Sequence, residues 1–257
     1  MRELLNRGLR EVRAFDCDET GLFNLEHDLN SDRLCPVIGD VRDPSRVAEA
    51  LEDVSLVYHL AALKHVETCE LEALEAVKTN IIGTANLING ALCTGVHSRF
   101  LTISTDKVVY PVGIYAATKL IAEIMTIQAN NSFRNKRTLF SAVRFGNIFD
   151  TRGSVFDIWR KQKAENKPLT VTDERMVRFF WPMSAAVKFI LQVTERMEGG
   201  EIFVPTMPSF TIIELAKKLS DKIIVMGIRP GESLTHRLMT TEEEAKAVKG
   251  DGMWIIK

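Results

Sequence analysis

The sequence lacks an excess of charge of either sign. Its 257 residues include 33 lysines and arginines and 34 aspartates and glutamates, for a formal net charge of −1. Proteins that bind nucleic acid or an anionic membrane electrostatically usually present a field of basic residues. This balance therefore predicts neither nucleic acid nor a membrane as a partner.

Cysteine and histidine are scarce and scattered. The four cysteines form no CxxC pair, and the five histidines form no HExxH motif. Widely spaced cysteines of this kind are typical of reduced thiols in a reducing compartment. The pattern also predicts no metal site, because no cluster has the spacing of metal ligands.

Long apolar runs are missing as well. The longest, near residues 54–63, is too short to span a bilayer. The opening residues, MRELLNRGLREVR, lack the apolar core of a signal peptide. We therefore expect a cytoplasmic protein.

What the sequence does contain is a regular alternation of strand and helix patterns. This alternation predicts an α/β fold built on a doubly wound parallel sheet with right-handed crossovers. The predicted strands cover residues 11–15, 35–39, 54–62, 99–104 and 138–145. The predicted helices cover residues 19–30, 43–53, 71–95 and 113–131.

The pattern loosens after residue 146. We predict a main domain over residues 1–150, and over 151–257 mainly a small substrate-binding lobe with late elements of the sheet. The predicted helices there cover residues 154–166, 184–197 and 211–220. The predicted strands cover residues 168–172, 201–205 and 222–228.

Polar residues follow several of the predicted strands. In an open α/β sheet, ligands bind outside the carboxyl ends of the strands. We therefore expect these residues to meet at one crevice. They are Asp16 and the stretches 61–65, 104–107 and 145–152.

Tyr115 and Lys119 are four residues apart on a predicted helix and so share one face. A lysine ammonium and a nicotinamide cation beside the phenol lower its pKa, and the phenolate can then take a proton from a sugar hydroxyl as hydride leaves. A YxxxK match on its own is usually ordinary helix surface. Its position shortly after a strand that ends in Ser-Thr favours the catalytic interpretation.

Asp106 and Lys107 stand between that strand and that helix. Such a pair is often a solvated part of a loop. Beside a bound sugar, however, an amine can remove a proton from the carbon next to a ketone, and a carboxylic acid can protonate a departing hydroxyl. These are the two halves of a β-elimination of water.

Three residues are candidates for the adenosine end of a nucleotide cofactor. Asp16 has the position of an acidic residue that binds the ribose, which favours NAD over NADP. A helix N-cap is the alternative for this acidic stretch, a role that Asp18 could fill. Asp40 and Val41 could touch the adenine, although a plain turn would explain them equally well.

The segment HLAALKHVE follows the next strand. Ala61 and Ala62 are small enough for the backbone to approach a cofactor, and Lys64 is polar just beyond them. His65 could bind substrate or be an ordinary loop histidine. Asn80 falls inside a predicted helix, where a buried amide often braces a neighbouring loop.

Further substrate-binding candidates lie after the strand predicted over residues 138–145. Asn147 could hold a sugar or phosphate, and Arg152 precedes a predicted helix N-terminus that suits a diphosphate. Arg178, Arg229 and Glu232 extend the set. Ordinary surface arginines are the alternative for each guanidinium.

Taken together, the motifs resemble a known family. STDK at 104–107, AALKHV at 61–66, VRFGN at 143–147, RMVRFFW at 175–181 and GIRPGE at 227–232 look like the extended short-chain dehydrogenase/reductases. Specifically, they resemble the UDP-N-acetylglucosamine 4,6-dehydratases (5-inverting), with the capsule and polysaccharide biosynthesis dehydratases next. The resemblance runs from about residue 11 to about residue 232.

The resemblance implies a Rossmann-type domain that holds NAD or NADP, a UDP-sugar substrate and a homo-oligomer built through the helices at 71–95 and 113–131. Tyr115 with Lys119 would oxidise the C4 hydroxyl, and Lys107 would take the C5 proton. Asp106 would help expel the C6 hydroxyl as water, while Thr105 would hold the substrate. The product would be a UDP-4-keto-6-deoxy-hexosamine for surface polysaccharide or glycan biosynthesis.

The sequence departs from this family in two places. The Gly-rich loop GxxGxxG is absent, together with the first strand that precedes it, and the stretch GESLTHRLM differs from the usual continuation around Glu232. A misassigned start or a fragment is the explanation we favour over a rearranged fold or a non-catalytic relative. A nucleotide-sugar 4-epimerase or dehydrogenase and an inactive sugar-nucleotide-binding protein stay open as alternatives. So do the cofactor, the sugar and the stereochemistry at C5.

Overall fold

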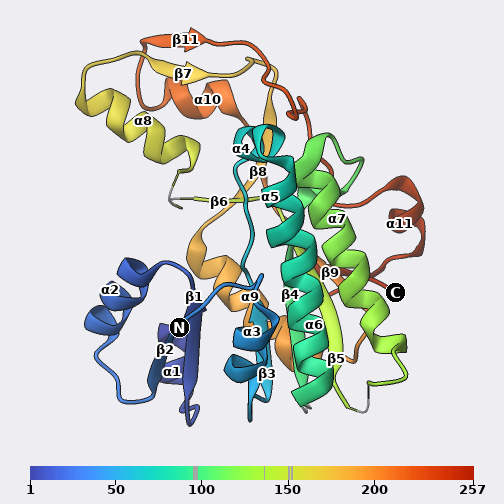
Figure 1. The fold of residues 1–257 in the computed structure, drawn as a ribbon. Coiled ribbons are helices and arrows are strands. Elements are labelled where there is room, and N and C mark those ends of the chain that lie inside the picture. The colour runs from blue at the N-terminus through green and yellow to red at the C-terminus, as the bar shows by residue number, and fades with distance from the viewer. Residues whose placement is uncertain (95–97, 136, 150, 152) are drawn as a thin grey trace.

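A six-stranded sheet forms the centre of the molecule (Figure 1). The computed structural model describes residues 1–94, 98–135, 137–149, 151 and 153–257. The strand order is β12-β13-β9-β5-β4-β3, and the pairs from β3 to β9 are parallel. These parallel strands are β3 (Leu56–His59), β4 (Arg99–Thr105), β5 (Leu139–Phe145) and β9 (Ile202–Pro205).

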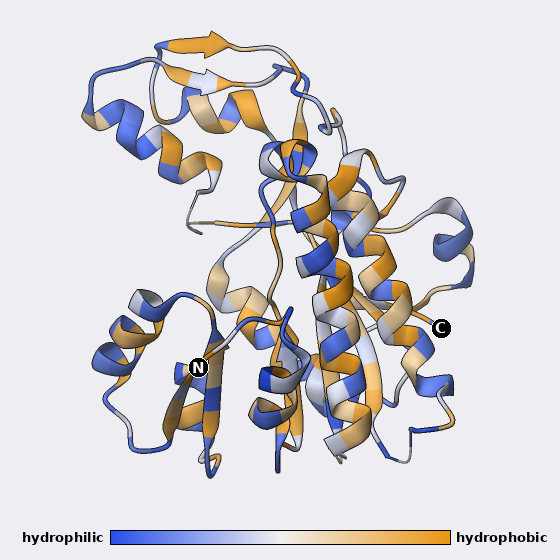
Figure 2. Ribbon diagram, in the orientation of Figure 1, coloured by the Kyte–Doolittle hydropathy of each residue, from blue (hydrophilic) through white to orange (hydrophobic). Residues whose placement is uncertain are grey.

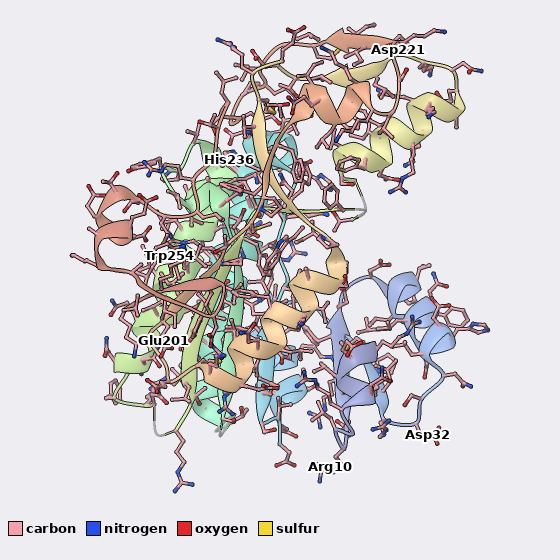
Figure 3. The ribbon with its side chains drawn as sticks, turned by 180° about the vertical axis from the view of Figure 1, so that it is seen from behind. Arg10, Asp32, Glu201, Asp221, His236 and Trp254 are labelled. Carbon is pink, nitrogen blue, oxygen red and sulfur yellow. The ribbon has the colours of Figure 1, made fainter. Side chains whose placement is uncertain are left out.

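Helices cover both faces of this sheet, as a doubly wound fold requires. On one face lie α3 (Pro44–Leu51), α6 (Gly83–Thr94) and α7 (Gly113–Gln128), and on the other lies α9 (Met183–Arg196) (Figures 1 and 3). Successive strand residues point to opposite faces. Phe100 therefore packs into the core beneath α3 and α6, whereas its neighbour Leu101 packs against α9.

The first two strands form a sheet of their own. β1 (Val12–Asp16) pairs in parallel with β2 (Leu34–Ile38), and no strand pairing joins β1 to β3 in the described part of the chain. Helices α1 (Arg2–Asn6) and α2 (Glu19–Leu29) accompany this pair. Their apolar side chains make a small separate core around Leu22 and Leu34.

The predicted helix over residues 71–95 is wrong as a single element. The structure divides this region into α4 (Val66–Leu71), α5 (Ala73–Ala76), a π-helical segment (Val77–Ile82) and α6, and the last predicted residue lies outside the described ones. A π turn inserts an extra residue into the helical repeat and often marks a functional position. Here it redirects Asn80 toward the loop after β3.

Strands that the sequence did not reveal extend the main sheet. β13 (Met253–Ile256) pairs antiparallel with β9, and β12 (Val248–Gly250) pairs antiparallel with β13. The sheet is therefore mixed rather than wholly parallel. Burial explains why the last residues join it, since Met253 is fully enclosed in the core against α9.

A smaller group of elements lies beyond the carboxyl ends of the central strands (Figure 1). β7 (Leu169–Val171) pairs in parallel with β11 (Ile223–Val225), and α8 (Val155–Ala164) and α10 (Ile212–Lys217) pack with them around the buried Trp159. A three-stranded sheet lies next to this lobe. Its members are β10 (Ser209–Thr211), β8 (Val177–Trp181) and β6 (Asn147–Ile148).

Candidate functional site

A pocket lies just past the carboxyl end of β4. That strand ends at Thr105, a single 3₁₀ turn over Asp106–Val108 follows, and α7 begins at Gly113. The pocket's lining includes Lys107, Tyr115 and His236. Lys107 and Tyr115, both predicted from the sequence, therefore line the same pocket as His236, which comes from a distant segment of the chain.

Asp106 is the hub of the hydrogen bonds behind this wall. Its Oδ1 accepts from Thr105 Oγ1 at 3.1 Å and from Lys107 Nζ at 2.9 Å, and its Oδ2 lies 3.0 Å from His236 Nδ1. The Asp106 side chain is 0% exposed, whereas that of Lys107 is 21% exposed. Asn147 also reaches this cluster, because Lys107 Nζ lies 3.5 Å from its Oδ1.

The charges of this cluster keep Asp106 ionised. Burial alone would raise its pKa, but the Lys107 ammonium and the hydrogen bond from His236 outweigh burial and hold the pKa well below its usual range. Asp106 is thus a carboxylate at neutral pH. The elimination predicted from the sequence requires a carboxylic acid at this position.

Tyr115 and Lys119 come from the same helix face, as predicted, but make different contacts. Burial raises the pKa of Tyr115, and the negative charge of Asp106 raises it further. A hydrogen bond with Thr105 lowers the pKa, but by less than burial raises it. Lys119 Nζ donates to the carbonyl of Ile103 at 2.7 Å, and burial lowers its pKa to about 8. The lowering expected from the sequence depends on a nicotinamide cation beside the phenol and stays a prediction.

The loop after β3 is held by Asn80, as the sequence predicted. Its Oδ1 accepts from the Leu63 N–H at 2.8 Å, and its Nδ2 donates to the Leu63 carbonyl at 3.1 Å and to Thr118 Oγ1 at 3.0 Å. Both polar groups of the Leu63 backbone are thereby satisfied. This loop is consequently fixed to α7, the helix that carries Tyr115.

The candidate residues of this loop lie at the surface. Ala61, Lys64 and His65 are exposed, and Ala62 is half-buried. The His65 ring packs against the backbone of Gly153, since a Cβ at that glycine would come within 2.6 Å of the ring. His65 therefore lies beside the turn that leads into α8, on the side of the lobe.

The adenosine-end candidates have distinct surroundings. Asp16 is exposed at the end of β1, and Asp18 caps α2 by accepting from the Gly21 N–H at 2.9 Å. Asp40 forms an ion pair with Arg42, in which Arg42 Nη2 lies 2.5 Å from Asp40 Oδ2. Val41 is buried in the main core. Both contacts agree with the plain-turn interpretation. Asp16 Oδ1 accepts from the Asp18 N–H at 3.0 Å, and the Asp16 side chain stays exposed.

Two of the predicted arginines, Arg178 and Arg229, bind groups of the protein itself. Arg178 donates to the carbonyls of Val177, Ser233 and Leu234 at 2.7–2.9 Å, which fixes the segment leading to His236. Arg229 pairs with Glu232 at 2.7 Å.

Glu232 has one oxygen to spare. Its Oε2 is buried, and among the described residues it has no hydrogen-bond partner. Arg152, the remaining candidate, lies outside the described residues. Direct binding of substrate by these residues stays a prediction.

His236 is the site residue that the sequence did not predict. It belongs to the stretch GESLTHRLM, which drew notice only as a departure from the family pattern. Its contact with Asp106 joins residues 130 positions apart in the chain. A histidine shortly after a motif that contains Glu232 is the only signal the sequence offers, and it does not indicate the partner.

Comparison with known proteins gives the context of this site. A family model described as "Polysaccharide biosynthesis protein" matches residues 1–257. A Campylobacter jejuni protein named "UDP-N-acetylglucosamine 4,6-dehydratase (inverting)" is 42% identical over 91% of this chain and 71% of its own length. A Methanocaldococcus jannaschii protein named "Uncharacterized membrane protein" is 43% identical over 100% of this chain and 80% of its own.

A third relative carries the name of another activity. A Rickettsia bellii protein named "UDP-glucose 4-epimerase" is 37% identical over 94% of this chain and 72% of its own. No helix within the described residues has both the length and the apolar character needed to cross a bilayer.

Two solved structures share the fold. The X-ray structure of Pen from Bacillus thuringiensis superposes with a TM-score of 0.92 at 35% identity, covering 99% of this chain and 84% of that one. The dTDP-glucose 4,6-dehydratase DesIV from Streptomyces venezuelae, with NAD and TYD bound, superposes with a TM-score of 0.84 at 23% identity, covering 95% and 85%. The predicted α/β fold of the Rossmann type is confirmed.

Proposed function

Because the chain belongs to the polysaccharide biosynthesis protein family, we propose that it is a 4,6-dehydratase that acts on UDP-N-acetylglucosamine with inversion at C5. The observation that carries this proposal is that Tyr115 and Lys107 line the same pocket, and that Lys107 forms an ion pair with the buried Asp106. A redox residue and an amine base can then act on neighbouring carbons of one sugar ring. We further propose that residues 1–150 hold the cofactor and that residues 151–257 mainly hold the sugar nucleotide.

The donor set fits NAD at both of its riboses. The exposed Asp16 carboxylate at the end of β1 suits the adenosine ribose, and Tyr115 and Lys119 on α7 suit the nicotinamide end. The bound NAD of the structural relative DesIV is in keeping with this choice. When bound, NAD would accept hydride from C4 and return it to C6.

Tyr115 then removes the proton of the C4 hydroxyl. The resting tyrosine is neutral, since its pKa is raised, so a positive charge beside the phenol is needed to ionise it. Lys119 is the described cation four residues away on the same helix face.

Lys107 is the base of the elimination. The C4 ketone acidifies the proton at C5, and a neutral Lys107 Nζ can take it once the amine has released its own proton. Reprotonation of C5 from the opposite face, with a proton that has exchanged with solvent, would invert this centre. The resemblance assigns the acid for the C6 hydroxyl to Asp106.

The product of incubation with UDP-N-acetylglucosamine in deuterated water tests this function. We expect a 4-keto-6-deoxy sugar lighter by one water, with deuterium at C5, identified by mass spectrometry and NMR. Replacing Lys107 by methionine should lower turnover by about 10²–10⁴-fold, the usual contribution of a general base. Lys217→Met, on the exposed side of α10, is the matched control and should leave turnover unchanged.

A 4-epimerase is the second candidate, and the Rickettsia relatives favour it. That reaction would use Tyr115 and Lys119 but would not need Asp106 or Lys107. An epimer of unchanged mass would therefore overturn the dehydratase proposal. Unchanged UDP-N-acetylglucosamine and no nicotinamide in the purified protein would instead indicate a binding protein without turnover.

A further inference from the structure

Tyr110 has an unusual backbone conformation in the turn between β4 and α7. Its φ is +52°, in the left-handed region that a bulky side chain rarely adopts. The described part of the chain has four other non-glycine residues with a positive φ, and all are asparagine or aspartate: Asn30, Asp53, Asn166 and Asp251. Among the described residues, Tyr110 is therefore the one aromatic residue held in this region.

The residues after Tyr110 make this conformation more costly. Pro111 follows directly, and a proline restricts the residue before it toward extended backbone conformations. Gly113, two residues further along, also has a positive φ, and a Cβ there would collide with the Glu70 carboxylate. The turn thus has glycine at one left-handed position and a tyrosine at the other.

The contacts of Tyr110 with the rest of the protein do not offset this strain. Its hydroxyl accepts from the Thr241 N–H at 3.3 Å and lies 3.4 Å from Thr241 Oγ1, and both distances are longer than those of strong hydrogen bonds. Burial does not hold the residue either, because Tyr110 is 55% exposed. A strained residue that contributes little to packing is typical of a binding or catalytic site.

Tyr110 lines the same pocket as Lys107 and Tyr115. Val109 and Val112 line it from the same turn, which lies at the end of α7 nearest the lobe (Figure 1). The turn therefore gives the pocket an apolar side, whereas Lys107 and Tyr115 contribute its polar groups. One face of a pyranose ring presents mainly C–H groups, and these pack well on the electron-rich face of an aromatic ring.

We propose that Tyr110 is a substrate-binding residue whose ring packs against the sugar of the nucleotide-sugar substrate. This inference rests on the dehydratase function proposed above. The left-handed backbone sets the direction of the ring, and the contact with Thr241 limits its rotation. A sugar held against this ring keeps C4 and C5 within reach of Tyr115 and Lys107.

Tyr110→Asn tests this role, because asparagine suits a positive φ but has no aromatic ring. We expect the KM for UDP-N-acetylglucosamine to rise about tenfold, the effect of losing one aromatic contact. The kcat should change little, as when binding is lost equally from the ground state and the transition state. The inhibition constant of UDP, which lacks the sugar, should stay at its wild-type value.

Two further variants separate the ring from the hydroxyl and from aromatic residues in general. Tyr110→Phe restores the ring without the hydroxyl and should recover most of the affinity for UDP-N-acetylglucosamine that Tyr110→Asn loses. Phe133→Asn removes an exposed aromatic ring beyond the other end of α7 and should match the wild type with both compounds. A KM for Tyr110→Phe as high as that of Tyr110→Asn would contradict the role of the ring.

The comparison between sugar nucleotide and nucleotide decides the proposal. Equal weakening of UDP-N-acetylglucosamine and UDP in Tyr110→Asn, or no weakening of either, would overturn it. Tyr110→Gly serves if the asparagine variant does not fold, since glycine takes a positive φ freely, and the same selective loss is expected. Failure of the wild type to dehydrate UDP-N-acetylglucosamine would instead overturn the function itself.

Discussion

Lys119 is a cation that the fold encloses almost completely, with an exposed fraction of 4%. Its ammonium binds one backbone carbonyl, that of Ile103, and is helped by the charge of Glu123. These contacts do not replace its lost hydration, so its pKa falls from 10.5 to about 8. Near neutral pH, Lys119 can therefore change its charge as the site requires.

This shift predicts a dependence of stability on pH. Between about pH 8 and pH 10.5 the folded chain has released the Lys119 proton while the unfolded chain still holds it. The free energy of unfolding of the wild type relative to Lys119→Met should consequently rise with pH across this window. Urea unfolding of both proteins at several pH values measures it, and a flat difference would show that Lys119 keeps its ordinary pKa.

Arg144 joins three elements through one buried guanidinium. From β5 it donates to Glu123 on α7 at 2.6 Å and to Glu243 on α11 (Thr241–Lys246) at 2.8 Å. Burial lowers its pKa, but the two carboxylates outweigh burial and raise the pKa above the usual range. The ion cluster therefore connects the C-terminal segment to the central sheet.

Breaking this cluster should be strongly destabilising. Arg144→Met leaves Glu123 buried without its cation, and we expect a loss of about 3–5 kcal/mol in the free energy of unfolding. Adding Glu123→Met should recover part of that loss, because the uncompensated charge is then gone. Urea unfolding of the single and double variants is the measurement, and a double variant less stable than the single one would contradict this account.

At the scale of the whole molecule, several exposed apolar side chains lie on the helices of one face of the main sheet. Leu74 on α5, Ile82 beside α6, and Ile121 and Ile124 on α7 are exposed. Figure 2 shows hydrophobic residues along these neighbouring helices. Contiguous exposed apolar surface is typical of an interface. The homo-oligomer predicted from the sequence would be built through these helices.

Light scattering tests this assembly. We expect Ile124→Glu to shift the oligomer toward the monomer, because a buried carboxylate without a partner opposes association. Met183→Glu, at an exposed position on α9 across the sheet, should leave the mass unchanged. A wild type that is already monomeric would overturn the prediction.

Local patterns in the sequence were sufficient for much of the fold. The helix predicted over residues 43–53 is α3, and Asp43 caps it by accepting from the backbone N–H groups of Ser45 and Arg46. β13 escaped prediction because it depends on a distant partner, β9. The sequence also did not predict the π turn that interrupts the helix expected over 71–95. This turn places Asn80 against the backbone of Leu63, a distant contact that helix propensity does not encode.

The sequence by itself determined which groups stand at the end of β4 and the start of α7. Neighbours along a strand end or one helical turn are fixed by backbone geometry, so Asp106, Lys107, Tyr115 and Lys119 could be placed without a structure. Only the tertiary structure decided which of them faces the pocket. Packing buried Asp106 and brought His236 to it across 130 residues, a contact that no local geometry specifies.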